Sequence, residues 1–75
     1  MDVRDAIKEM LNESRASMRS VSLGMGKSES FLYVTLTKNS VPQADTLAAI
    51  AAQCGYTLAL IPNGETLPAS AIVID

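Results

Sequence analysis

The sequence contains no histidine, no tryptophan and a single cysteine, Cys54. Without histidine, and with one thiol, the chain cannot assemble the common zinc sites or a Cys-His catalytic pair. No disulfide can support the fold, so we interpret Cys54 as a small apolar core residue. No catalytic triad, metal cluster or phosphate-binding loop can be assembled from the remaining residues, and we expect no cofactor. The composition therefore argues against an enzyme.

Long apolar runs are also missing. No stretch approaches the roughly 20 apolar residues that span a bilayer, and the N-terminus has no signal-peptide pattern. We therefore expect a cytoplasmic protein with no membrane partner. With 75 residues the chain makes one domain that buries only about 60 to 65 % of its unfolded surface. Such a core is thin, and pairing with a second copy would enlarge it.

Basic residues are absent after residue 40, and the net charge of the chain is −2. Low basicity argues against a sequence-independent nucleic-acid binder, whose affinity comes mostly from neutralising phosphates. The charge is uneven, however, because residues 1–40 contain five acidic residues and all six basic residues. The basic residues are Arg4, Lys8, Arg15, Arg19, Lys27 and Lys38. If the fold gathers Arg19, Lys27 and Lys38 on one surface, a basic face survives on an acidic protein.

The spacing of apolar residues predicts helices over Asp2 to Glu13, Met18 to Met25 and Gln43 to Cys54. Asp2 is suited to cap the first helix and Ser17 the second. Gly26 and Gly55 lie where helices would end in a left-handed conformation. The predicted core is made of residues from all the helical segments: Ile7, Leu11, Val21, Leu32, Leu36, Leu47 and Ile50.

The segment Ser28 to Lys38 is ambiguous by composition. Its aromatic and β-branched residues favour a strand, but a strand here would be flanked by helices and would need a C-terminal partner. Ser28 is a good N-cap, Glu29 suits the first turn of a helix, and Leu32 and Leu36 form an inward seam. We therefore predict a helix from Ser28 to Lys38.

The C-terminal region changes its pattern. Lys38 to Pro42 is predicted to be a turn, and Pro62 to Glu65 a second one. Tyr56 to Ile61 alternates as a short strand does, and Ala71 to Ile74 is a second β-prone segment. The expected fold is mainly α, with four to five short helices followed by a short C-terminal β segment.

The order of these elements resembles the helix-turn-helix domain of the lambda-repressor and Cro-like group, the XRE family. Residues 17–55 carry the resemblance: the capped second helix from Ser17, Val21-Ser22 in place of Leu-Ala, the turn glycine Gly26, Ser28-Glu29-Ser30-Phe31-Leu32, Leu36-Thr37, Pro42, Asp45-Thr46-Leu47, Ile50-Ala51 and Gly55. A strand after Gly55 is also common in antitoxin-like members. The resemblance divides the chain into a helix-turn-helix domain, residues 1–55, and a C-terminal β segment, residues 56–75.

In such a domain the third helix lies in the major groove of double-stranded DNA. The resemblance implies base contacts from Ser28, Glu29, Ser30, Tyr33 and Val34. It also implies phosphate contacts near the start of the second helix and on both sides of the third: Ser17, Met18, Arg19, Lys27 and Lys38. The implied function is a sequence-specific transcriptional regulator.

An unpaired strand at Tyr56 to Ile61 would need a partner. We expect a homodimer in which the C-terminal segments pair about a two-fold axis, using Tyr56, Leu58, Leu60, Ile61, Ile72 and Ile74. The alternative function is that of an antitoxin or other protein-binding helix-turn-helix module, whose main partner is a protein such as a toxin.

Overall fold

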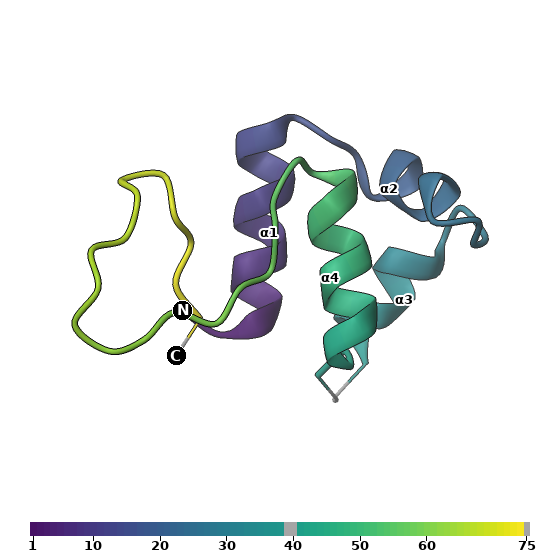
Figure 1. Cartoon of the computed structure of the whole chain (residues 1–75). Coiled ribbons are helices and arrows are strands. Elements are labelled where there is room, and N and C mark those ends of the chain that lie inside the picture. Colours follow the sequence, from purple (N-terminus) through teal and green to yellow (C-terminus); the bar gives the residue numbers. More distant parts are fainter. Residues whose placement is uncertain (39–40, 75) are drawn as a thin grey trace.

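The computed structural model describes residues 1–38 and 41–74, which form four helices and no strand. The helices are α1 (Val3–Ser14), α2 (Met18–Gly24), α3 (Phe31–Thr37) and α4 (Ala44–Gln53). In Figure 1, α1 and α4 stand side by side, and α2 and α3 lie together on the other side of α4. The predicted mainly helical class is confirmed. Of the predicted turn at Lys38 to Pro42, Asn39 and Ser40 lie outside the described residues.

The first two helices begin at caps that the sequence predicts. The backbone N–H of Asp5 donates to the Asp2 carboxylate at 2.8 Å. At α2, the N–H of Ser20 donates to the Ser17 hydroxyl at 3.0 Å, and the N–H of Ser17 donates back to the Ser20 hydroxyl at 3.1 Å. These bonds satisfy N–H groups that have no partner inside a helix, which fixes the start of each helix.

Three helices are followed by a residue in the left-handed conformation. Gly26 (φ 73°) follows α2 and Gly55 (φ 79°) follows α4, as predicted. After α1 the same conformation is held by Arg15 (φ 58°), where glycine would be the ordinary choice. Residues other than glycine, asparagine and aspartate adopt this conformation at a cost of about 1 to 2 kcal/mol, so Arg15 is mildly strained at this helix end.

The core lies between all four helices. Each of the seven residues predicted to form it is buried. They make a single cluster with Met10, Ala51 and Cys54, so the expected role of Cys54 as a buried core thiol is also confirmed. Leu32 and Leu36 point inward from α3, which confirms a helix rather than a strand in this part of the ambiguous segment.

A buried serine joins α2 to α3. Ser22 is fully buried, and its hydroxyl donates to the Met18 carbonyl at 2.7 Å. The same oxygen accepts the backbone N–H of Leu32, in the first turn of α3, at 3.0 Å. One side chain of α2 thus satisfies a backbone group at the start of α3, which fixes how the two short helices meet.

Ser22→Ala is expected to lower the free energy of unfolding by about 1 to 3 kcal/mol, because it leaves the Leu32 N–H buried without a partner. Chemical denaturation measures this loss. Ser28→Ala is the matched control, since the Ser28 side chain is exposed and should tolerate the change within about 0.5 kcal/mol. Equal stabilities for the two variants would contradict the role of Ser22.

The predicted C-terminal strands are wrong for the single chain. Residues 57–61 and 71–74 are not strands; the short-range bonds of this region are turns, Glu65 N–H to the Pro62 carbonyl and Ala71 N–H to the Pro68 carbonyl. The chain leaves α4, passes α1 and makes a wide loop (Figure 1). Strand propensity produces a strand only where a neighbouring segment pairs with it, and this loop keeps the two segments unpaired.

Candidate nucleic-acid interface

The start of α2 faces the turn that precedes α3. Arg19 Nε donates to Glu29 Oε2 at 3.0 Å, and the two side chains are 71 % and 65 % exposed. One residue predicted to contact phosphate is therefore joined to one predicted to contact a base. The bond uses one of the five N–H donors of the guanidinium, so the others remain available to a ligand.

The turn from Lys27 to Ser30 is longer than the sequence predicts. Ser28, Glu29 and Ser30 lie before α3 rather than in its first turn, and Ser28 does not cap the helix. Instead, the N–H of Phe31 donates to the Ser28 carbonyl at 3.0 Å in a tight turn. The reason is that Ser22 of α2 already satisfies the N–H of Leu32, so α3 starts without a local cap.

The outer face of α3 is apolar and aromatic, with cations at both ends. Tyr33 is 60 % exposed and Val34 43 % exposed, while their neighbours Leu32 and Leu36 are buried. Lys27 lies before the helix, with its ammonium 5.6 Å from the centroid of the Phe31 ring. Lys38 follows the last helical residue and is exposed.

All ten residues that the resemblance assigns to DNA contact are exposed. The packing of α2 against α3 brings the start of α2 and the turn to one region, with the Arg19–Glu29 pair as the direct contact between them. Of the six residues assigned to dimerisation, Tyr56 and Ile72 are half-buried against the core. The other four are exposed: Leu58, Leu60, Ile61 and Ile74.

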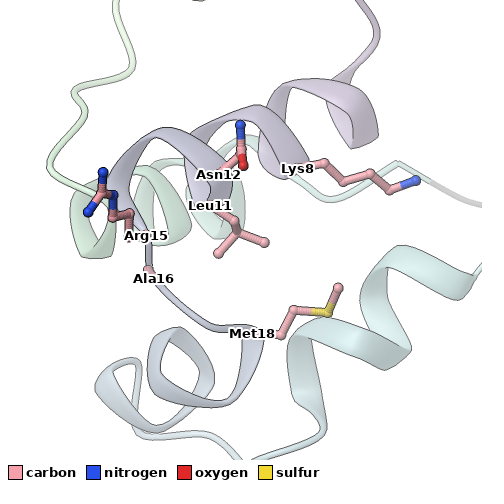
Figure 2. Close-up of a pocket in the computed structure, with 6 residues that line it drawn as sticks. All are labelled: Lys8, Leu11, Asn12, Arg15, Ala16 and Met18. Carbon is pink, nitrogen blue, oxygen red and sulfur yellow. The ribbon is translucent and has the colours of Figure 1, made fainter.

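Sequence reasoning missed a second polar group beside the start of α2. Lys8, Asn12 and Arg15 of α1 and its C-terminal cap border a hollow whose floor includes Leu11 and Met18 (Figure 2). For Lys8 and Asn12 the signal was available, because residues four apart share a face of a helix. Arg15 lies beyond the helix, so its position depends on the turn that follows. Only Met18 of this group was predicted to contact a ligand.

The described residues hold no group of three or more His, Cys, Asp or Glu side chains placed to bind a metal ion. Among the helices described above, none combines the length and apolar character needed to cross a membrane. Comparisons of the chain with protein-family models, curated proteins and solved structures find no match.

Proposed function

We propose that this protein is a sequence-specific DNA-binding transcriptional regulator that acts as a homodimer. In this proposal α2, the turn and α3 form a helix-turn-helix unit similar to that of the lambda-repressor and Cro-like family. The observation that carries it is the Ser22–Leu32 hydrogen bond. That bond holds two short helices together from the inside and leaves the start of α2, the turn and the outer face of α3 exposed together.

The exposed side chains suit the major groove. Serine hydroxyls of the turn can donate to or accept from any base, and the Glu29 carboxylate can accept from cytosine N4. Tyr33 and Val34 offer apolar surface to a thymine methyl group. Lys27 and Lys38 then reach phosphates on the two sides of the groove, which sets the register of α3 on the DNA.

The Arg19–Glu29 pair tunes this binding. Glu29 partly neutralises Arg19 and brings a negative charge close to the phosphates, so it lowers affinity for DNA in general. It recovers that loss where a cytosine amino group lies opposite its free oxygen. The pair therefore favours discrimination between sequences over affinity.

Glu29→Gln is expected to bind DNA of any sequence more tightly, with a slope of log K against log salt steeper by about one unit. The preferred base facing residue 29 should shift from cytosine toward adenine, which glutamine recognises. The free energy of unfolding should change by less than about 1 kcal/mol, because an exposed ion pair contributes little to stability. Fluorescence anisotropy and site selection measure these effects. Unchanged base preference would contradict the role of Glu29.

The dimer in this proposal forms through the C-terminal segment. Within the described chain, residues 57–61 make no backbone hydrogen bond, and Leu58, Leu60 and Ile61 are exposed. A second copy can satisfy the backbone groups and cover the apolar side chains together. Two-fold pairing would place two copies of α3 about 34 Å apart, one turn of DNA, on a near-palindromic site.

The proposal is tested by selecting duplexes from a randomised pool with the full chain and measuring binding at several salt concentrations. We expect a near-palindromic site to be enriched. Lys27→Ala and Lys38→Ala should each weaken binding to every sequence and reduce the salt slope by about one unit per subunit. No enrichment of any duplex would overturn the proposal and favour the protein-binding alternative.

A further inference from the structure

The charges of α1 are sorted by sign around the helix. At about 100° per residue, Arg4 and Lys8 of α1 fall within about 40° of each other, on one stripe, and Arg15 adds a third cation at the C-terminal cap of the helix. Asp5, Glu9 and Glu13 fall on another stripe, about 120° away around the axis. Simple solubility does not require such sorting, because mixed charges solubilise a helix equally well. One edge of α1 is therefore basic on a protein whose net charge is −2.

The C-terminal half of this basic stripe borders the hollow beside α2. Figure 2 shows Leu11 and Met18 pointing toward the space between α1 and α2, with Lys8 at one end and Arg15 at the other. Asn12 lies between the two cations and adds an amide. Met18 is itself one of the residues assigned to DNA contact, so the hollow borders the proposed DNA-binding surface.

The two cations are free to bind a ligand. Neither Lys8 nor Arg15 makes an ion pair with a described residue, whereas Arg19 is held by Glu29. Arg15 also keeps a left-handed backbone conformation (φ 58°) at a helix end where glycine would fit without strain. Arg15 therefore carries an unpaired charge at a position where the fold itself would favour glycine, which leaves its guanidinium available to an anionic ligand.

From these observations we infer that Lys8, Asn12 and Arg15 bind the sugar–phosphate backbone of the duplex next to the groove that α3 occupies. This inference rests on the proposed function and adds a contact outside the helix-turn-helix unit. The cations and the amide would bind phosphate oxygens, while the exposed Met18 would contact the apolar face of a deoxyribose. The site would supply phosphate contacts that the residues of α2 and α3 provide sparsely.

The test uses fluorescence anisotropy with a duplex selected by the full chain, across a range of salt concentrations. The double variant Lys8→Gln/Arg15→Gly should bind about 10- to 100-fold more weakly at 0.1 M salt and lose about two units of salt slope per subunit. Because glycine suits the conformation of residue 15, the melting temperature of Arg15→Gly should be equal to or above that of the unchanged protein. Weaker binding then cannot be explained by unfolding.

A compensated variant separates local contact from overall charge. Glu9→Gln/Glu13→Gln, added to the double variant, restores the net charge without restoring the basic stripe. We expect binding to stay weak; recovery of the original affinity would overturn the inference. A salt slope that is unchanged in the double variant would also overturn the inference, and the basic residues would then be assigned to an acidic protein partner. If the unchanged protein binds no duplex, the proposed function itself fails, and this inference fails with it.

Discussion

Leu32→Ala is expected to lower the free energy of unfolding by about 2 to 5 kcal/mol. Leu32 is fully buried at the centre of the contacts between α3 and the rest of the core. A domain of this size has a total stability near the lower end of the usual range of about 5 to 15 kcal/mol. The variant should therefore be partly or wholly unfolded at physiological temperature, as circular dichroism during heating would record.

Tyr33→Ala is the matched control, one residue further along α3. Its side chain is 60 % exposed, so its loss should change stability by no more than about 0.5 kcal/mol. Binding to the selected duplex should nevertheless weaken, because Tyr33 lies on the proposed contact face. If Leu32→Ala melts like the unchanged protein, the described packing of α3 is wrong.

Leu60→Glu is expected to convert the proposed dimer into a monomer. Leu60 is 99 % exposed, so the substitution removes no contact from the single chain and should leave its helical spectrum unchanged. In a two-fold interface the change places two carboxylates close together in an apolar contact, which is strongly unfavourable. Loss of the second subunit should weaken operator binding by about 10²- to 10⁴-fold, the usual gain from linking two sites.

Sedimentation velocity and anisotropy measure the two effects on the same samples. Leu67→Glu is the control, because Leu67 is also exposed but lies outside residues 56–61, the segment proposed to pair in the dimer. It should remain dimeric and bind normally. A Leu60→Glu protein that sediments like the unchanged dimer would contradict the proposed interface.

The parts of the fold that the sequence predicted are those set by local chemistry. Asp2, Ser17, Gly26 and Gly55 mark helix ends because a side-chain oxygen or a left-handed glycine satisfies backbone groups close by in the chain. The buried residues could also be predicted locally, because apolar residues three and four apart share one face of a helix. In α3, packing of Leu32 into the core outweighs the strand preference of its neighbours, which is small for each residue.

The features that were missed depend on contacts between distant residues. The helix was predicted to start at Ser28, but α3 starts at Phe31, because Ser22 of another helix accepts the backbone N–H of Leu32. The prediction of C-terminal strands was wrong because a strand needs a neighbouring strand to pair with. The composition of the two segments does not determine whether the loop between them brings them together. For the candidate site, the exposed residues could be listed from the sequence, but the Arg19–Glu29 pair and the hollow beside Met18 needed the packed helices.

The most direct test of the DNA-binding proposal is to follow backbone amide resonances of the full chain by NMR while the selected duplex is added. Changes are expected at residues 17–19 and 27–38, and also near Lys8, Asn12 and Arg15 on α1. Amides on the outer side of α4 should keep their positions. Resonance changes confined to α4 or to the C-terminal segment would contradict the proposal, because the duplex would then bind away from α2 and α3.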